Sequence, residues 1–239
     1  MTGSARKRKA VGDVAAIRRV VVVGGTSGIG AAVAERFAAA GAEVTVAGLD
    51  APAPGVELDV TRPDQVTAFF DRFDSLDVLV NAAGVLQRDD EHRPEVFERV
   101  LAVNLTGTMR ACVAARPALV AAGGCVVNVA SMLSFFGGPR VPGYSASKGG
   151  VVQLTKALAV AWAADGVRVN AVAPGWIRTR LTEELQERPG AAERIIDRTP
   201  MGRWGEAAEV AGAVAFLAGP DAGFVTGAVL PVDGGYLAS

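Results

Sequence analysis

The chain has little of the residue types on which many catalytic sites depend. Its 239 residues include one histidine, His92, and two cysteines, Cys112 and Cys125. A Ser-His-Asp triad or a histidine-ligated metal needs a histidine at the reacting centre, whereas His92 stands between Glu91 and Arg93 in a stretch that predicts a solvated loop. Two cysteines do not make a disulfide framework or a metal cluster. We therefore expect no metal site and two buried cysteines.

The chain also lacks a strong charge of either sign and any apolar run of membrane length. Its net charge is −1, so no overall field attracts nucleic acid or an acidic membrane. No apolar segment reaches the roughly 20 residues of a membrane span, and none of signal-peptide type follows the basic cluster at the start of the chain. We expect residues 1–17 to form a flexible basic extension. We also expect a cytoplasmic protein with no nucleic-acid or membrane partner.

From residue 19 onward, short apolar runs alternate with helical patterns. Strands are predicted at 19–23, 43–47, 56–58, 77–81, 125–130, 167–173 and 228–232. Helices are predicted near 28–40, 63–73, 94–122, 145–164, 181–198 and 206–218. Several strands are continuous valine-rich runs, which suit strands covered on both faces. The alternation predicts a single α/β domain over residues 18–239, with a parallel sheet and helices on both faces.

The first predicted strand leads directly into a glycine-rich turn, GGTSGIG, at residues 24–30. Glycines permit a tight turn and a close approach of the backbone to an anion, and the helix that follows presents free N–H groups and a positive dipole end. The position between a strand and a helix favours a dinucleotide-binding turn over a plain loop. The predicted contacts in this turn are Gly24, Thr26, Ser27, Gly28, Ile29 and Gly30.

The choice between NAD and NADP depends on the end of the second strand. Asp50 lies twenty residues after Gly30, about where a carboxylate would accept hydrogen bonds from an adenosine ribose. Such a carboxylate favours NAD and repels the additional phosphate of NADP, and neither TSGIG nor AGLD contains an Arg or Lys to pair that phosphate. The alternative is that Asp50 belongs to a turn before Pro52, because Gly48 ends the strand itself. The sequence favours NAD over NADP.

One of the two tyrosines, Tyr144, precedes Lys148 by four residues. Residues at this spacing share one face of a helix, and a nearby ammonium is expected to lower the pKa of a tyrosine from about 10. Such a tyrosine can act as a general acid/base when a hydride moves to or from a secondary alcohol. A structural tyrosine beside a surface lysine is the alternative for the pair alone. Ser131, at a predicted strand end, and the glycine turn favour the catalytic interpretation.

Six motifs occur in a fixed order along residues 19–239. They are GGTSGIG (24–30), NAAG (81–84), VNLTG with Asn104, NVASM with Ser131, YSASK (144–148) and PG (174–175). Together they resemble the short-chain dehydrogenase/reductase family. This resemblance implies a Rossmann-type doubly wound sheet of seven parallel strands, a small-molecule substrate and a homotetramer.

The resemblance also implies roles for individual residues. Tyr144 is the acid/base, Lys148 binds the nicotinamide ribose and tunes Tyr144, and Ser131 hydrogen-bonds the reacting oxygen. Asn104 would hold a water in a proton relay through Lys148. The other implied cofactor contacts are Asp50, Asp59, Val60, Asn81, Ala82, Gly84, Pro174, Gly175, Ile177 and Thr179.

The stretches that surround Ser131 and Tyr144, together with RIIDRTPMGRWG, resemble the sugar-acid branch of this family, notably 2-dehydro-3-deoxy-D-gluconate 5-dehydrogenases and gluconate 5-dehydrogenases. An anionic polyol substrate follows from that resemblance.

Arg140 lies between Ser131 and Tyr144, and Arg88 follows the fourth predicted strand. We hypothesise that one of them, with Arg140 the first choice, pairs a substrate carboxylate bidentately. The alternative is a solvated loop arginine. Residues 181–200 are predicted to form a mobile lid.

Two other functions remain open from the sequence. An NADPH-linked reductase of 3-oxoacyl thioesters would want a cation near positions 48–49, where Gly48 and Leu49 stand. A catalytically silent dinucleotide-binding protein has no need to keep the whole set of catalytic residues, which are Asn104, Ser131, Tyr144 and Lys148. The sequence therefore favours an NAD-linked dehydrogenase of a secondary alcohol.

Overall fold

A computed structural model describes residues 19–239, so the predicted extension at 1–17 lies outside the described residues. Seven parallel strands form one sheet in the order β3-β2-β1-β4-β5-β6-β7. The strands are β1 (Arg19–Val23), β2 (Glu43–Gly48), β3 (Val56–Glu57), β4 (Val78–Asn81), β5 (Cys125–Val129), β6 (Arg168–Pro174) and β7 (Val229–Val232). The predicted Rossmann-type sheet is confirmed, and each strand end lies within one residue of its predicted position.

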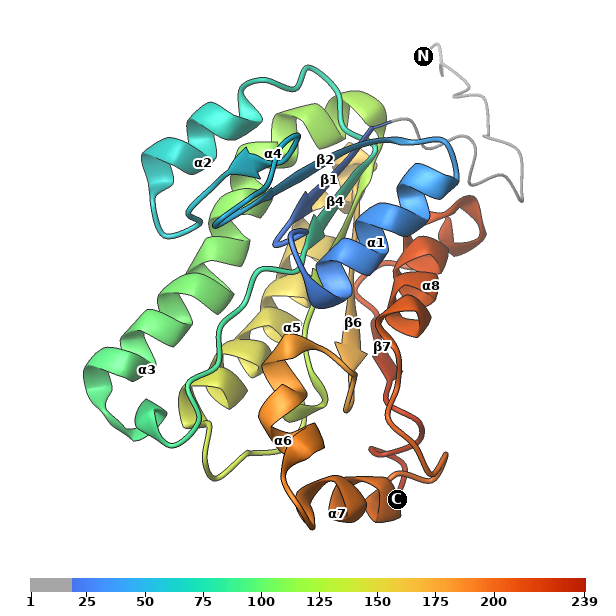
Figure 1. Ribbon diagram of the computed structural model, residues 1–239. Helices are drawn as coiled ribbons and strands as arrows, with labels where there is room; N and C mark the ends of the chain where they lie inside the picture. Colours follow the sequence, from blue (N-terminus) through green and yellow to red (C-terminus); the bar gives the residue numbers. More distant parts are fainter. Residues whose placement is uncertain (1–18) are drawn as a thin grey trace.

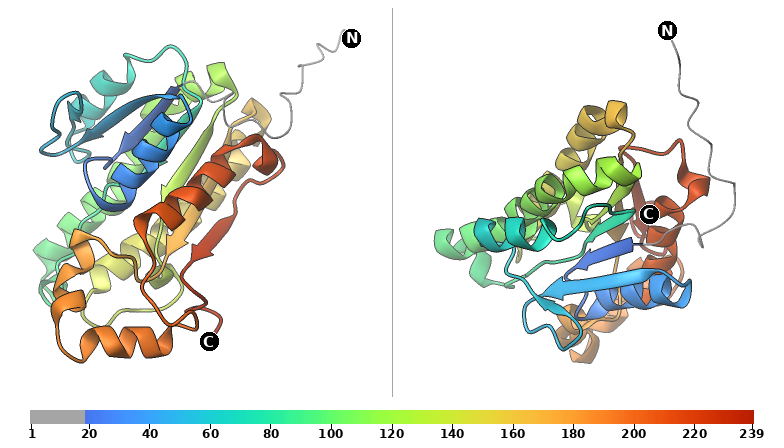
Figure 2. Two further views of the ribbon diagram at one scale, coloured as in Figure 1. Left: turned by 45° about the vertical axis from the view of Figure 1, so that its right-hand side comes forward. Right: turned by 90° about the horizontal axis from the view of Figure 1, so that it is seen from above.

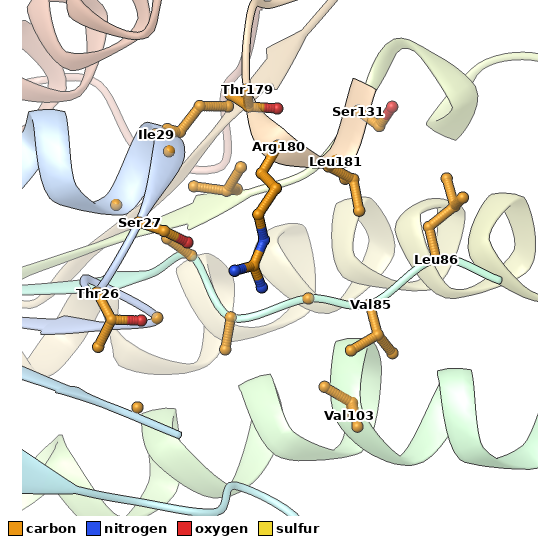
Figure 3. Close-up of a pocket in the computed structure, with 18 of the residues that line it drawn as sticks. Thr26, Ser27, Ile29, Val85, Leu86, Val103, Ser131, Thr179, Arg180 and Leu181 are labelled. Carbon is orange, nitrogen blue, oxygen red and sulfur yellow. The ribbon is translucent and has the colours of Figure 1, made fainter. Parts of the chain in front are cut away.

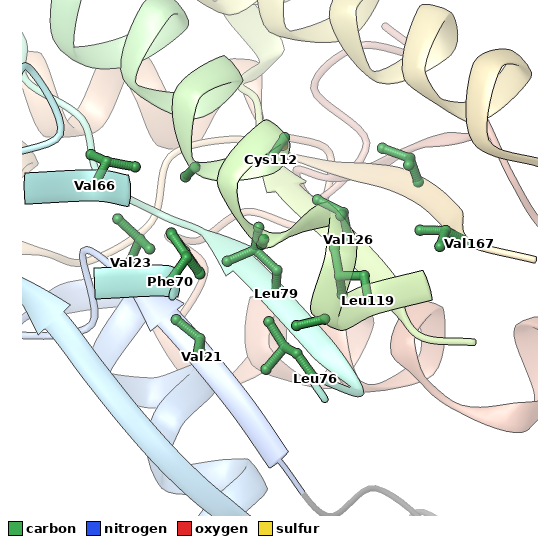
Figure 4. Packing of buried hydrophobic residues seen from close by; sticks show 14 of the residues in the cluster. Val21, Val23, Val66, Phe70, Leu76, Leu79, Cys112, Leu119, Val126 and Val167 are labelled. Atoms are coloured by element: carbon green, nitrogen blue, oxygen red, sulfur yellow. The ribbon is translucent and has the colours of Figure 1, made fainter. Parts of the chain in front are cut away.

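The valine runs explain why helices cover both faces of the sheet. In β1, Val20 and Val22 face α1 (Gly28–Ala39) and α8 (Ala207–Ala218), while Val21 and Val23 face the opposite layer. That layer contains α2 (Pro63–Phe70), α4 (Thr108–Ala122) and α5 (Pro142–Trp162). Figures 1 and 2 show the sheet between the two layers, and Figure 4 shows side chains of the second layer packed on the strands. Continuous Val runs therefore supply apolar side chains to two cores at once.

The strand order creates a crevice at the carboxyl ends of the central strands. The chain passes from β1 to β2 and β3 on one side, then returns to place β4 on the other side of β1. Loops that leave the carboxyl ends of β1 and β4 therefore diverge, and ligands of doubly wound sheets bind in the crevice between such loops. The short helices α6 (Glu183–Glu187) and α7 (Ala191–Arg198) lie beyond the carboxyl ends of β6 and β7 (Figure 1).

Two predicted helices are interrupted in the structure. The helix predicted at 94–122 is α3 (Pro94–Leu101), a π-helical segment (Ala102–Gly107) and then α4. The helix predicted at 181–198 is two helices, because Arg188 takes an extended conformation before Pro189 and Gly190 has a φ of 72°. A residue before proline is disfavoured in the helical region, which ends α6.

Helix α5 begins three residues earlier than predicted, at Pro142. Proline suits the first helical position because the N–H that it lacks would have no partner within the helix. Tyr144 therefore lies in the first turn of α5, and Lys148 follows one turn later on the same face.

Candidate functional site

A pocket of about 550 Å³ opens at the carboxyl ends of the central strands. Figure 3 shows its lining from the glycine turn to the loop after β4. Most residues predicted from the sequence lie in this lining: Gly24, Thr26, Ser27, Gly28, Ile29, Gly30, Asp50, Asp59, Val60, Ala82, Gly84, Ser131, Tyr144, Lys148, Pro174, Gly175, Ile177 and Thr179. The structure thus brings the glycine turn and the Ser131–Tyr144–Lys148 group to one cavity.

The glycine turn packs against the loop after β4 more closely than any side chain would allow. Gly24 has a φ of 80°, and a Cβ at this position would lie 2.3 Å from the Ala83 nitrogen. A Cβ at Gly30 would lie 2.1 Å from the Gly24 oxygen. The turn is therefore shaped by the absence of side chains, and it holds the start of α1 at the pocket wall.

The start of α1 is open to an anion. Ser27 precedes the helix in an extended conformation, and its side chain makes no capping hydrogen bond. No acidic residue occupies the first turn of this 12-residue helix. The free N–H groups and the positive end of the helix dipole therefore face the pocket without an internal anion. Together with the glycine cradle, these features fit the pyrophosphate of a dinucleotide.

Two carboxylates lie at the predicted adenosine end of the pocket. Asp50 has a φ of 51° in the turn after β2, so it belongs to a turn and also lines the cavity. Asp59 accepts hydrogen bonds from the Thr61 backbone N–H (2.8 Å) and hydroxyl (2.7 Å). These bonds lower the pKa of Asp59, chiefly through the Thr61 hydroxyl, and they orient its carboxylate.

Tyr144, Ser131 and Lys148 come from different elements and meet at the pocket wall. Ser131 follows β5 and caps a short 3₁₀ helix, where its hydroxyl accepts from the Leu133 N–H at 3.1 Å. The Ser131 side chain lies close enough to that of Tyr144 to lower the pKa of the Tyr144 hydroxyl. Lys148 is buried, its Nζ donates to the Val129 carbonyl at 2.6 Å, and Nζ lies 5.6 Å from the centre of the Tyr144 ring. A hydroxyl pair with an ammonium behind it is a suitable arrangement for proton exchange with an alcohol.

The pKa shifts of this pair differ from the expectation based on spacing. Burial raises the pKa of Tyr144, the nearby Ser131 side chain lowers it, and the charge of Glu91 raises it further. Burial also lowers the pKa of Lys148 from 10.5 to about 8. The predicted lowering of the Tyr144 pKa by Lys148 is thus wrong, because the buried surroundings disfavour both charged forms.

Lys148→Met should change how stability depends on pH. The folded pKa of Lys148 lies below its unfolded value, so the unfolded chain binds more protons between about pH 8 and 10.5, and stability rises with pH across this window. We expect the wild type to gain up to about 3 kcal/mol relative to Lys148→Met over the window. Denaturant unfolding of both proteins at about pH 7 and about pH 10 measures this difference. A difference that is the same at both pH values would contradict a charged, buried Lys148.

Asn104 connects two segments next to the pocket through its side-chain hydrogen bonds. It lies in the π-helical segment and is fully buried. Its side-chain amide donates to the Val85 carbonyl (2.9 Å) and to the Ser147 hydroxyl (3.0 Å), and its side-chain oxygen accepts from the Val85 N–H (2.8 Å). A Cβ at Gly84 would lie 3.5 Å from both the Asn104 oxygen and Lys148 Nζ. Asn104 therefore joins the loop after β4 to α5 beside Lys148, although it is not part of the lining.

Asn81 is also placed outside the lining. Its side-chain amide donates to Asn128 Oδ1 at 2.9 Å and to Cys112 Sγ at 3.2 Å. Asn128 in turn donates to the Thr155 hydroxyl at 2.9 Å. This network ties the ends of β4 and β5 to α4 and α5. Burial raises the pKa of Cys112 to about 12, which keeps the thiol protonated.

The two arginines proposed for the substrate occupy different places. Arg140, the first choice from sequence, is exposed, pairs with Asp89 through both its Nε and a terminal nitrogen, and does not line the pocket. Arg88 lines the pocket, its side chain is 14% exposed, and its Nη1 lies 3.6 Å from Glu184 Oε2 of α6. The structure therefore places Arg88, and not Arg140, in the lining of the pocket that also contains Ser131 and Tyr144.

Sequence reasoning missed one further cation. Arg180 lines the pocket, and Figure 3 shows its guanidinium extending into the cavity on the side of Ser27. The Arg180 guanidinium makes no ion pair or hydrogen bond with any residue between 19 and 239. The only available signal was its place next to Thr179, and the predicted lid included neither residue.

The tryptophans near this region pack against each other instead of lining the pocket. Trp176 and Trp204 meet edge to face with ring centres 5.7 Å apart, in a cluster with Leu185 and Ile195 of α6 and α7. They hold the two short helices onto the body of the molecule.

None of the helices between residues 19 and 239 has the length and apolarity that crossing a bilayer requires. The same part of the chain has no group of three His, Cys, Asp or Glu side chains that could hold a metal.

Several known proteins with similar sequences and structures are named as dehydrogenases. Residues 23–237 match the family described as enoyl-(acyl carrier protein) reductase. A galactitol 2-dehydrogenase (L-tagatose-forming) of Cereibacter sphaeroides is 42% identical over 236 residues, which cover 90% of this chain and 93% of that protein. A 2-dehydro-3-deoxy-D-gluconate 5-dehydrogenase of Escherichia coli is 35% identical over 239 residues, covering 91% of this chain and 94% of the relative.

Solved structures agree with these relatives. A gluconate 5-dehydrogenase from Burkholderia cenocepacia, in complex with NADP and tartrate, matches with a TM-score of 0.89 at 32% identity and covers 93% of this chain and 96% of its own. Two other solved relatives also hold NADP. The family match, the sheet order and the pocket confirm the resemblance based on six motifs. The chain belongs to the short-chain dehydrogenase/reductase family and is an oxidoreductase that acts on CH–OH groups.

Proposed function

We propose that this protein oxidises a secondary alcohol of a sugar acid or related polyol, and reduces the corresponding ketone, with a nicotinamide dinucleotide. The observation that carries the proposal is that Tyr144, Ser131 and Lys148 line the same pocket as the glycine turn and the open start of α1. One end of the cavity fits the phosphates of a dinucleotide, and the other offers a proton-exchanging hydroxyl. The chemistry that a bound nicotinamide ring supplies is the acceptance or donation of a hydride.

The protein's own residues handle the proton. In alcohol oxidation, the Tyr144 oxygen would accept the hydroxyl proton while the Ser131 hydroxyl holds the same substrate oxygen. In ketone reduction, Tyr144 would return the proton to that oxygen. Because burial raises the pKa of Tyr144, its neutral form dominates near neutral pH, which suits the donating role. Alcohol oxidation is therefore expected to accelerate as the pH rises.

Lys148 and Asn104 support this exchange in the proposal. The ammonium of Lys148 would hold the ribose hydroxyls next to the nicotinamide, and a water beside Asn104 would connect it to solvent. Supporting this placement, both polar groups lie within 3.5 Å of a Cβ built on Gly84, whose backbone lines the pocket. The residues proposed to hold the other end of the dinucleotide are the glycine turn, Asp50 and Asp59.

We propose NAD as the favoured dinucleotide. Asp50 and Asp59 line the end of the pocket that would receive the adenosine, and a second phosphate on the ribose would meet their charge. The NADP found in solved relatives supports the opposite choice. Thermal-shift measurements with NAD, NADH, NADP and NADPH decide between them, since the tighter ligand stabilises more at equal concentration.

We propose that Arg88, in place of Arg140, binds the substrate carboxylate. Arg88 is a largely buried cation on the loop after β4, it lines the same pocket as Ser131 and Tyr144, and a carboxylate already lies near it, in Glu184 of α6. A sugar-acid carboxylate can take the place of Glu184 on the guanidinium. Arg140 forms an ion pair with Asp89 and does not line the pocket.

Arg88→Gln should raise KM for a sugar acid by about 10- to 100-fold, the equivalent of one charge-assisted hydrogen bond, with kcat much less affected. Steady-state kinetics on gluconate and on the neutral polyol galactitol measure the effect. Arg140→Gln is the matched control and should change KM by less than about twofold. An unchanged KM for gluconate in Arg88→Gln, or an equal rise for galactitol, would contradict a carboxylate contact.

We also propose a cytoplasmic homotetramer. Exposed apolar side chains on α4, α5 and α8 support association, with Val113 50%, Val160 82% and Phe216 47% exposed. Both cysteines are buried and are too few for a disulfide framework, which is compatible with a reducing compartment. Light scattering of the purified protein gives the molar mass that tests the assembly.

A further inference from the structure

A carboxylate is buried directly beneath the proposed acid/base. Glu91 lies in a short 3₁₀ helix (Asp90–His92) between β4 and α3, and it is 1% exposed although Asp90 and His92 on either side are exposed. Burying a carboxylate costs free energy unless its oxygens are hydrogen-bonded. Glu91 therefore calls for a specific set of partners.

Those partners are backbone N–H groups from two segments. Glu91 Oε1 accepts from the Gln87 N–H at 2.8 Å, and Oε2 accepts from the Tyr144 N–H at 2.7 Å. No lysine or arginine among residues 19–239 forms an ion pair with Glu91. The Tyr144 N–H is one of the first-turn donors of α5 that has no partner within the helix, and the 21-residue α5 places its positive dipole end there. The backbone N–H donor and the positive dipole end at the start of α5 thus stabilise the Glu91 carboxylate in place of a lysine or arginine.

The fit around this carboxylate is close. A Cβ at Gly143, the residue before Tyr144, would lie 3.3 Å from Glu91 Oε2 and 3.2 Å from the Phe97 ring of α3. The carboxylate is thus held from one side by α3 and from the other by α5. Its second bond goes to the residue just before Arg88, whose side chain lines the pocket.

We propose that Glu91 is a positioning residue for the reaction, which fixes the backbone of Tyr144 relative to the loop that carries Arg88. This inference rests on the proposed function of Tyr144 as the acid/base. One side chain then sets the distance between the proton-exchanging group and the substrate contact. A shift of about 1 Å between such groups can lower a rate by about 100-fold, so the constraint is catalytic in effect.

The charge of Glu91 gives this role a distinctive signature. The charged groups that face Tyr144 are Glu91, beneath its amide, and Lys148, one turn along α5, while Ser131 faces it from the end of β5. Glu91 raises the pKa of Tyr144, so its removal lowers that pKa. In alcohol oxidation, which needs the ionised tyrosine, the rising limb of kcat/KM should move to lower pH.

The experiment compares Glu91→Gln, Glu91→Asp and the exposed control Glu98→Gln in alcohol oxidation across pH. Glu91→Gln keeps the shape but loses the charge and one acceptor, and we expect kcat to fall by about 10- to 100-fold, the limb to shift to lower pH, and dinucleotide affinity to stay within about twofold. Glu91→Asp keeps the charge on a shorter arm, so it should lower kcat without shifting the limb. Glu98→Gln should behave as the wild type.

Three results would overturn the inference. The first is wild-type kcat with an unshifted limb in Glu91→Gln. The second is a loss of dinucleotide affinity and thermal stability in step with kcat, which marks a purely structural role. If Glu91→Gln does not fold, wild-type kcat in Glu91→Asp would be the third. Tyr144→Phe is measured alongside: retained activity there defeats the proposed function itself, whereas its loss beside an unaffected Glu91→Gln defeats only this inference.

Discussion

Tyr144→Phe should lower kcat by about 100- to 10,000-fold, the range that a general acid/base contributes. The phenyl ring keeps the packing at the pocket wall but removes the hydroxyl that we propose exchanges the proton, together with its interaction with Ser131. Dinucleotide affinity should stay within about twofold, because the glycine turn and the start of α1 are unchanged. Single-turnover kinetics together with a dinucleotide titration separate the two quantities.

The chain offers a matched control for this substitution. Tyr236 is the only other tyrosine, it is buried against Phe136 with ring centres 6.1 Å apart, and it does not line the pocket. Tyr236→Phe should leave kcat within about twofold of the wild type, since no reacting group is removed. Equal losses in the two variants, or retained activity in Tyr144→Phe, would contradict the assignment of Tyr144.

Gly24→Ala should abolish dinucleotide binding and lower the free energy of unfolding by about 2–5 kcal/mol. About 1–2 kcal/mol comes from placing a side chain at a positive φ, and about 1–3 kcal/mol from the clash with the Ala83 backbone. That Cβ would lie 2.3 Å from a backbone nitrogen that has no side-chain freedom to move. Denaturant unfolding and a dinucleotide titration measure the two effects.

Gly41 separates the two causes. Its φ of 85° is close to the 80° of Gly24, but a Cβ there would meet no atom within 4 Å. Gly41→Ala should therefore cost only about 1–2 kcal/mol and leave dinucleotide binding intact. If the two variants lost the same stability and both bound the dinucleotide, then the close approach of the turn to the loop after β4 would not be needed for dinucleotide binding.

The sheet could be predicted because its signal is local. Val20 to Val23 form a continuous apolar run, and a strand buried on both faces needs such a run whatever its neighbours are. The interruption at Pro189 and Gly190 also had a local signal, which the helical pattern of 181–198 obscured. The π-helical segment that contains Asn104 had no such signal, and its Asn104 side chain bonds to residues far along the chain, in the loop after β4 and in α5.

The positions of the site residues could be predicted where a motif contains them. Their pKa values could not, because these depend on burial. Spacing placed Lys148 next to Tyr144, but the pKa values of both depend on how deeply α5 is packed. Arg140 was preferred for its place in the sequence, whereas Asp89, 51 residues away, pairs with it outside the pocket. Glu91 looked like part of a solvated loop, and only the fold shows that the start of α5 covers it.

The central claim is that one pocket combines dinucleotide binding with proton exchange at Tyr144. The most direct measurement is the appearance of reduced nicotinamide when the purified protein is mixed with NAD or NADP and a series of sugar acids and polyols. We predict reduction in the wild type, faster with NAD than with NADP, and its loss in Tyr144→Phe. Absence of reduction with every sugar acid and polyol, or undiminished reduction in Tyr144→Phe, would contradict the account.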